Sequence, residues 1–235
     1  MEYLYSKNEN FEDFSSGRVL YNAKGIPNFS VRLLQEMYYR AKSYLKKNQD
    51  IIVYDPCCGG GYTLTILGLL DNYNISKIYG SDIEQRMIIF AEKNLNLLSY
   101  AGMENRKKEV IHLYQKYGKQ SHMEALKSCE RLEKMLKTEI KTELFVADCT
   151  KQLPYIIPDI ILTDVPYGQL VDWKAKEEEL SIEQMIEQLW NISNPDTILV
   201  VCMNKKQKIK NKSWTRIEKH IIGKRKFEIF KYSKG

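Results

Sequence analysis

Short, nearly continuous runs of apolar and β-branched residues recur along the chain, separated by stretches with apolar residues at helical spacing. Such runs are typical of strands that are covered on both faces of a parallel sheet. They predict five strands, at residues 51–54, 77–84, 143–149, 159–168 and 196–203. The helical spacing is clearest at residues 63–70 and 85–98. Strands that alternate with helices predict βαβ units, so the expected fold class is α/β with a mostly parallel sheet.

Two segments fall outside this alternation. Residues 1–50 precede the first strand, and the amphipathic stretch 29–45, with Ser30 as its N-cap, predicts a helical N-terminal lead-in. Residues 103–142 separate a predicted helix from the next strand by far more than an ordinary connection, and their Lys, Glu, Leu and Met content predicts a helical insertion. The main domain is therefore expected at residues 51–235, with this insertion inside it.

The C-terminal end of the chain is strongly basic. Residues 204–235 carry 12 Lys or Arg against 2 Asp or Glu, in a chain whose formal net charge is +6. Alternation beyond Lys212, with a bend at Gly223, predicts an antiparallel strand pair at one sheet edge. The basic end suggests a polyanionic partner, and a solvated lysine-rich surface explains the charge equally well. The candidate phosphate contacts are Lys205, Lys206, Lys208, Lys210, Lys212, Lys224, Arg225 and Lys226.

The composition argues against several classes of protein. No apolar run reaches 18 residues, and the first residues lack the charged and apolar regions of a signal peptide, so we expect a cytoplasmic protein without a membrane span. Five cysteines are an odd number, which fits a reduced compartment better than a disulfide framework. The three histidines stand far in sequence from the adjacent cysteines at 57 and 58, so no metal site is expected.

Aspartates stand at the ends of the predicted strands. Asp55, Asp82 and Asp148 end three of them, and Asp164 stands in the fourth. Any one of them could be a turn or cap residue, which is the commoner role of Asp. Ligands of open parallel sheets bind at the carboxyl ends of the strands, so four acids in that position predict a site there.

A glycine-rich loop follows the first of these acids. The dinucleotide pattern G-x-G-x-x-G would need a glycine at Leu64, which sets back the interpretation as an NAD-dependent oxidoreductase. Gly59 and Gly61 still allow a close approach of the backbone to a ligand. Asp82 follows Gly61 by 21 residues, the spacing at which an acid commonly meets ribose hydroxyls. The loop and this acid therefore predict a nucleoside-containing cofactor.

These residues also carry a resemblance. "DPCCGGG" resembles the first motif of methyltransferases that use S-adenosylmethionine (SAM), and "TDVPYG" resembles the fourth motif of the branch that methylates exocyclic amino groups, with Val165 in place of the first proline. Together with "GIPNFSVRLLQEMY", "KNLNLLS" and "IEKHIIGKRKFEIF", they make nearly the whole chain similar to the AviRa family of 23S rRNA guanosine methyltransferases. Gly60 departs from the serine expected in the first motif.

The resemblance implies a Rossmann-like sheet of seven strands in the order 3-2-1-4-5-7-6, with a helical insertion. It implies SAM as the cofactor and 23S rRNA or the large ribosomal subunit as the partner of a monomer. Methylation of a guanosine base, at an exocyclic amino group, is the implied reaction, with resistance to avilamycin-type antibiotics or housekeeping modification as its purpose. The implied cofactor-binding residues are Asp55, Cys57, Gly59, Gly61, Asp82, Ile83, Asp148 and Cys149.

The end of the fourth strand supplies the candidate catalytic residues. A base amino group is a poor nucleophile because its lone pair is delocalised into the ring. Asp164 and the carbonyl of Val165 could accept hydrogen bonds from its two N–H groups and direct that lone pair. Pro166 would stiffen the turn, and Tyr167 would stack on the base.

Simpler interpretations stay open. Tyr167 could fill the core, Phe29 could cover the cofactor or merely pack, and Cys57 and Cys58 are expected to be small loop residues rather than reactive thiols. The same motif would suit a methyltransferase of DNA adenine or of a protein amide. A protein that binds SAM and RNA without turnover is the alternative from another class.

Overall fold

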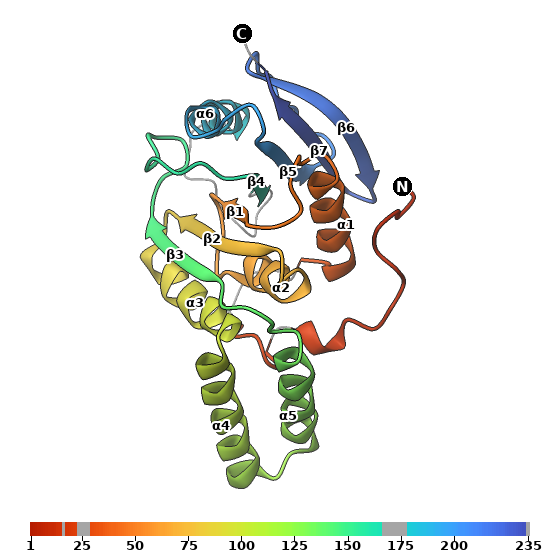
Figure 1. Cartoon of the computed structure of the whole chain (residues 1–235), viewed down its shortest axis with the longest axis vertical. Helices are drawn as coiled ribbons and strands as arrows, with labels where there is room; N and C mark the ends of the chain where they lie inside the picture. The colour runs from red at the N-terminus through yellow and green to blue at the C-terminus, as the bar shows by residue number, and fades with distance from the viewer. Residues whose placement is uncertain (16, 23–28, 166–177, 234–235) are drawn as a thin grey trace.

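The described residues form one seven-stranded sheet at the centre of the molecule (Figure 1). This computed structural model describes residues 1–15, 17–22, 29–165 and 178–233. The strand order is β3-β2-β1-β4-β5-β7-β6, and the first five strands run parallel while β7 is antiparallel to both β5 and β6. The strands are β1 (Ile51–Asp55), β2 (Ile75–Asp82), β3 (Lys141–Val146), β4 (Ile160–Asp164), β5 (Ile198–Asn204), β6 (Trp214–Ile222) and β7 (Arg225–Tyr232). The predicted fold class, strand order and edge pair are confirmed.

Helices cover both faces of this sheet. Residues of α1, α2 and α3 share one core cluster with strand residues, and residues of α6 share a second cluster on the other face. The helical elements are η1 (Glu12–Phe14), α1 (Val31–Lys42), α2 (Tyr62–Leu70), α3 (Gln85–Leu95), η2 (Asn96–Leu98), α4 (Tyr100–Tyr117), α5 (Gln120–Glu133) and α6 (Glu178–Asn191). Ser30 caps α1 as predicted, because its side chain accepts from the backbone N–H of Leu33 at 3.4 Å.

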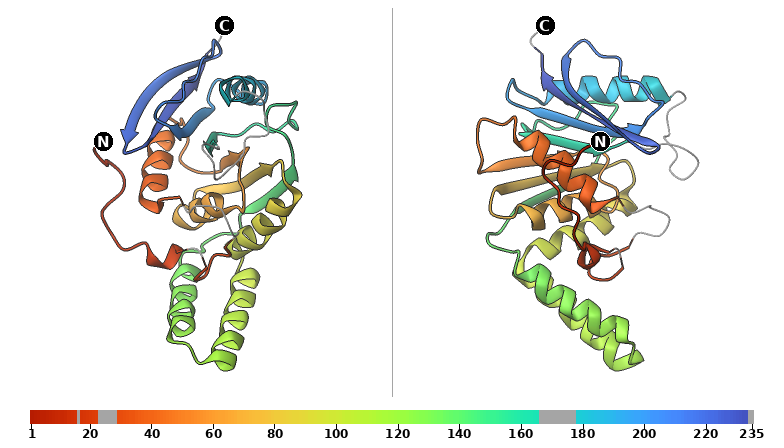
Figure 2. Two further views of the ribbon diagram at one scale, coloured as in Figure 1. Left: turned by 180° about the vertical axis from the view of Figure 1, so that it is seen from behind. Right: turned by 90° about the vertical axis from the view of Figure 1, so that its right-hand side faces the viewer.

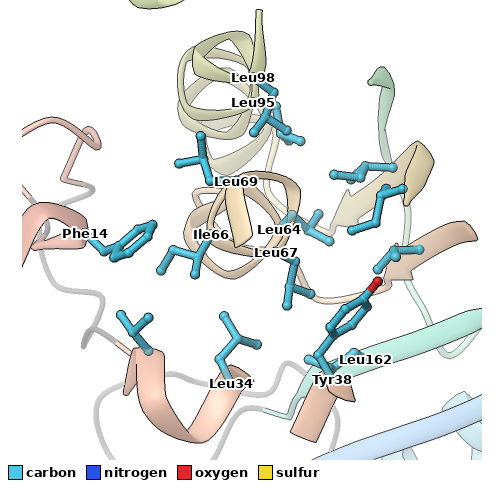
Figure 3. Close-up of a cluster of buried hydrophobic side chains, with 14 of the residues drawn as sticks. Phe14, Leu34, Tyr38, Leu64, Ile66, Leu67, Leu69, Leu95, Leu98 and Leu162 are labelled. Carbon is cyan, nitrogen blue, oxygen red and sulfur yellow. The ribbon is translucent and has the colours of Figure 1, made fainter. Parts of the chain in front are cut away.

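Burial on both faces explains why the strands read as continuous apolar runs. Leu162 of β4 lies beside Tyr38 of α1, in the cluster that also holds Leu34 and Leu67 (Figure 3). Its neighbour Ile161 faces the opposite way, into the cluster with α6. Each fully buried aliphatic side chain contributes roughly 1.5–3 kcal/mol of transfer free energy, so both layers stabilise the sheet.

Helices α4 and α5 form a hairpin that projects from the body, at the end of the molecule opposite β6 and β7 (Figure 1; Figure 2). Near the body, Met103 and Val110 of α4 and Cys129 and Leu132 of α5 are buried. Beyond Val110, most residues of α4 are exposed. Gly118 ends α4 with a φ of 61°, a left-handed conformation that suits glycine at a helix C-terminus.

One strand end differs from the prediction. β3 ends at Val146, so the expectation that the third strand reaches Asp148 is wrong. The backbone N–H of Ala147 still donates to the carbonyl of Asp82, and the chain then turns away from the sheet. Asp148 therefore lies in the loop, where Thr150 supplies two hydrogen bonds to its Oδ1.

Candidate active site

Three parallel strands end on aspartates at one edge of the sheet. Asp55, Asp82 and Asp164 are the last residues of β1, β2 and β4, and the loop after β3 adds Asp148 at the same edge. The sheet therefore gathers the carboxylates that the sequence singled out, although they are up to 109 residues apart in the chain.

The carboxylate of Asp55 begins the loop after β1. It accepts from the backbone N–H of Cys57 at 3.0 Å and from the hydroxyl of Thr63 at 3.2 Å, which ties the end of the strand to the start of α2. The side chain is almost fully buried. Burial raises its pKa to about 7, because the charged form loses its hydration.

The glycine loop crosses from β1 to the end of β2. The backbone N–H of Gly59 donates to Oδ2 of Asp82 at 3.0 Å, and that of Glu84 donates to Oδ1 at 2.9 Å. Gly61, at the N-terminus of α2, has a φ of 72°, and a Cβ there would lie 2.9 Å from Cα of Ala91. Gly61 is therefore required by the packing of α2 on α3, whether or not it also approaches a ligand.

The loop after β3 meets the glycine loop through two cysteines. The Sγ atoms of Cys57 and Cys149 are 3.6 Å apart, so two residues 92 positions apart in the sequence are neighbours here. Burial works to raise the pKa of Asp148, but hydrogen bonds from Thr150 and the hydrogen bond and charge of Lys151 together outweigh it, and the pKa lies below its ordinary value. Beside them, Ile83 is 45% exposed, which leaves an apolar surface next to Asp82.

Asp164 differs from the other acids because a cation faces it. Nη1 of Arg225, the first residue of β7, donates to Oδ2 of Asp164 at 3.0 Å. Oδ1 is buried and has no hydrogen-bond partner within the part of the chain that the structure describes. Burial raises the pKa of Asp164 to about 6, and the charge of Arg225 limits that rise. A hydrogen bond from the Cys202 thiol also works to lower this pKa, and Arg225 bonds Oδ2, so Oδ1 is the carboxylate oxygen that Arg225 leaves without a bond.

Buried residues lie next to Asp164 and Arg225. Val165 is fully buried, and its backbone N–H donates to the carbonyl of Cys202 at 2.9 Å. Phe29 is also buried, and the guanidinium of Arg225 lies 5.0 Å from the centre of its ring. Pro166 and Tyr167, the other two candidate catalytic residues, lie outside the described residues.

Two residues predicted to contact phosphates have other partners. Lys226 is buried, and its Nζ donates to Oε1 of Glu228 at 2.7 Å, so the prediction that it contacts phosphate is wrong. Arg225 bonds Asp164 and was missed as a site residue. No local pattern identifies it, because 61 residues separate it from Asp164. Arg225 reaches this position because β7 runs antiparallel to β5, which places Arg225 opposite Asn204 at the end of β5.

The chemistry of this edge fits SAM. The ribose hydroxyls, the adenine amino group and the methionine ammonium group are hydrogen-bond donors, and the edge presents the partly exposed carboxylates of Asp82 and Asp148 as acceptors. The exposed Ile83 offers an apolar contact for a flat base. A buried carboxylate also favours a cationic ligand, since a nearby positive charge stabilises its ionised form.

Other classes of site find no support within the described residues. No group of three or more His, Cys, Asp or Glu side chains there is placed to hold a metal ion. All five cysteines are free thiols, and burial raises the pKa of the Cys58 thiol, which makes it less nucleophilic. None of the helices described could cross a membrane.

Comparison with known proteins gives a consistent result. The family model of the rRNA methyltransferase AviRa matches residues 1–225. The chain is 32% identical over 222 residues to a 23S rRNA (guanine(2535)-N(1))-methyltransferase of Streptomyces viridochromogenes, covering 91% of this chain and 88% of that protein. A crystal structure of the rRNA methyltransferase AviRa from the same organism matches with a TM-score of 0.87 at 29% identity, over 96% of this chain and 94% of that one. TrmN from Thermus thermophilus shares the fold alone, with a TM-score of 0.54 at 10% identity over 87% of this chain and 49% of that one.

Proposed function

Because the chain belongs to the AviRa family of rRNA methyltransferases, we propose that it methylates N1 of a guanine in 23S rRNA, with Asp164 as the base that accepts the N1 proton. The sequence motif pointed to an exocyclic amino group, whereas the name of the Streptomyces relative specifies N1, a ring nitrogen. The observation that carries the proposal is the buried, unpartnered Oδ1 of Asp164 at the end of β4, in the part of the chain that is described.

Methylation of N1 requires a base that removes a proton before or during methyl transfer, whereas methylation of an amino group can proceed before its proton leaves. N1 of guanine carries a proton, and its electron pair becomes available for a new bond only when that proton leaves. A carboxylate with a pKa of about 6 is ionised at neutral pH and is basic enough to share this proton in the transition state. When bound, SAM supplies an electrophilic methyl carbon, and the electron pair of the broken carbon–sulfur bond stays on sulfur.

The roles of the other residues follow from their positions. Asp82 would accept from the ribose hydroxyls and Asp148 from the adenine amino group, while Ile83 would pack on the adenine ring. Cys57, Gly59 and Cys149 border the same loops and would line the cofactor site. Much of the acceleration would come from alignment and from fixed charges, since the methyl donor is already activated.

The substrate class can be tested directly. Purified protein is incubated with radiolabelled SAM and, in parallel, with 23S rRNA, large ribosomal subunits, DNA and unfolded protein. We expect label in the ribosomal substrate, at one guanosine that mass spectrometry identifies. A methyl group on N1 blocks Watson–Crick pairing and stops reverse transcription, whereas a single methyl group on the exocyclic amino group leaves one pairing N–H. Binding of RNA without label would favour the non-catalytic alternative.

Two substitutions of Asp164 distinguish methylation of N1 from methylation of the exocyclic amino group. For N1 methylation, Asp164→Asn and Asp164→Ala should both lower the rate by roughly 10²-fold or more, because neither side chain can take the proton. For an exocyclic amino group, Asn should retain much more activity than Ala, because an amide oxygen still accepts a hydrogen bond. Expression of the wild type and of Asp164→Ala in an avilamycin-sensitive strain tests whether the methylation gives resistance.

A further inference from the structure

Arg225 lies next to Asp164, so a base on which Asp164 acts must also come close to Arg225. It begins β7 opposite the last residue of β5, and the adjacent β4 ends on Asp164. The side chains of Arg225 and Asp164 are only 24% and 26% exposed, so their ion pair is shielded from bulk water. A charged pair in such surroundings interacts more strongly than one on an open surface.

Two of the contacts of the guanidinium group orient its plane. Nη1 bonds Oδ2 of Asp164 at 3.0 Å, and the ring of the buried Phe29 lies 5.0 Å from the guanidinium carbon. A cation above an aromatic face is attracted by the ring electrons. Phe29 therefore packs against Arg225, a contact that the sequence did not predict.

We propose that Arg225 is a specificity-determining residue that donates a hydrogen bond to O6 of the target guanine while Oδ1 of Asp164 accepts from N1–H. This inference rests on the proposed function. Guanine presents an acceptor at O6 beside a donor at N1, and adenine presents the reverse, a donor at N6 beside an acceptor at N1. An arginine next to a carboxylate thus matches guanine and opposes adenine.

The same pair serves the reaction. As the N1 proton moves to Oδ1 of Asp164, the electron pair of the N1–H bond stays in the ring and is delocalised onto O6. The positive charge of Arg225 stabilises the negative charge that develops there. N1 then uses this electron pair to form its bond to the methyl carbon, so the ring is neutral again in the product. Arginine suits this position better than lysine because its planar fork can serve Asp164 and O6 together.

The test combines replacement of O6 of the target guanine by sulfur with substitution of Arg225. Wild type, Arg225→Met and Arg225→Lys are compared on two RNA substrates, one with guanosine and one with 6-thioguanosine at the mapped nucleotide. Sulfur accepts hydrogen bonds weakly, so we expect the wild-type rate to fall about ten- to hundredfold on the thio substrate. Arg225→Met should be slow on both substrates, with a difference of less than about threefold, and Arg225→Lys should lie between the two.

Controls make each outcome decisive. Arg216→Met removes another arginine of the β6–β7 hairpin, one that pairs with Glu228 rather than Asp164, and it should behave as wild type. SAM affinity of the Arg225 variants should stay near wild type, thermal unfolding shows how far loss of the ion pair with Asp164 destabilises Arg225→Met, and Arg225→Lys keeps the test usable if that variant is unstable. An equal thio effect in wild type and in both Arg225 variants overturns the role of Arg225, as does the absence of any thio effect in wild type. Failure of the wild type to methylate N1 of guanine would instead overturn the proposed function.

Discussion

The aspartates of this site differ in pKa because their surroundings differ. Asp55 and Asp164 lose hydration through burial, and their pKa values rise to about 7 and about 6. Asp148 lies in a hydrogen-bonded loop, and its pKa is lowered. The surroundings therefore leave two acids, Asp55 and Asp164, able to take a proton near neutral pH and keep Asp148 as a permanent acceptor, a division of roles that the proposed methylation of N1 can use.

Asp55 should make the stability of the ligand-free protein depend on pH. Its folded pKa of about 7 lies above its ordinary value of 3.8, so its contribution is intact below pH 3.8 and is lost as pH rises through 7. Between pH 5 and 8, the wild type should lose about 2–3 kcal/mol more unfolding free energy than Asp55→Asn. Urea unfolding at both pH values measures the difference, and the exposed Asp196→Asn should follow the wild type. Parallel losses in all three proteins would contradict the burial argument.

Asp82 should matter for the cofactor. Asp82→Ala removes the acceptor of the Gly59 and Glu84 N–H groups and the expected partner of the ribose hydroxyls, so SAM binding should weaken by about 1–3 kcal/mol. Isothermal titration calorimetry with SAM measures the loss. Asp196→Ala is a matched control because Asp196 lies just before β5, at the amino ends of the strands. Equal affinity in the wild type and Asp82→Ala would refute the assignment.

At the scale of elements, local patterns predicted most of the architecture. Continuous apolar runs located five strands because both sheet faces are covered, and Ser30 located the start of α1. No helix was predicted at residues 178–191, where the structure has α6. The end of β3 was misplaced because an edge strand with exposed side chains carries a weak apolar pattern. The pair of Arg225 and Asp164 depends on how distant strands meet, which no local period encodes.

Gly102 should control how the hairpin leaves the body. A Cβ on Gly102 would lie 1.9 Å from the carbonyl oxygen of Asn96, a backbone atom that cannot move without disturbing η2. Although alanine is the better helix former, Gly102→Ala should lower the free energy of unfolding by about 1–3 kcal/mol, as overpacking does. The exposed Ala101→Gly, one position earlier, should cost only about 0.5–1 kcal/mol. Thermal unfolding of both variants provides the test, and a more stable Gly102→Ala would show that the hairpin shifts freely.

At the scale of the whole molecule, positively charged side chains lie beside the strand ends that carry the candidate active site. The loop after β5 begins at the carboxyl end of that strand, two strands from β1 and next to Asp164 on β4. Its five lysines are all exposed, namely Lys205, Lys206, Lys208, Lys210 and Lys212. One of them, Lys210, lies 4.0 Å from a carboxylate oxygen of Glu183. Near the amino ends of the strands, Lys46 and Lys47 pair with Asp196 and Asp159, whose carboxylates offset their charge. This asymmetry predicts that RNA approaches from the side of the loop.

Replacing Lys206 and Lys208 by Gln should weaken RNA binding and flatten its salt dependence. Each phosphate contact that is lost should reduce the slope of log K against log salt concentration by about 0.7–0.9, so the double variant should lose roughly 1.5 from the slope. Fluorescence anisotropy with an rRNA fragment that contains the mapped guanosine, between about 50 and 200 mM salt, gives this slope. The matched variant with Gln at Lys46 and Lys47 removes the same charge near the amino ends of the strands and should keep the wild-type slope. If both double variants flatten the slope equally, net charge alone governs binding, and if neither does, the loop lysines are a solvated surface without contact to RNA.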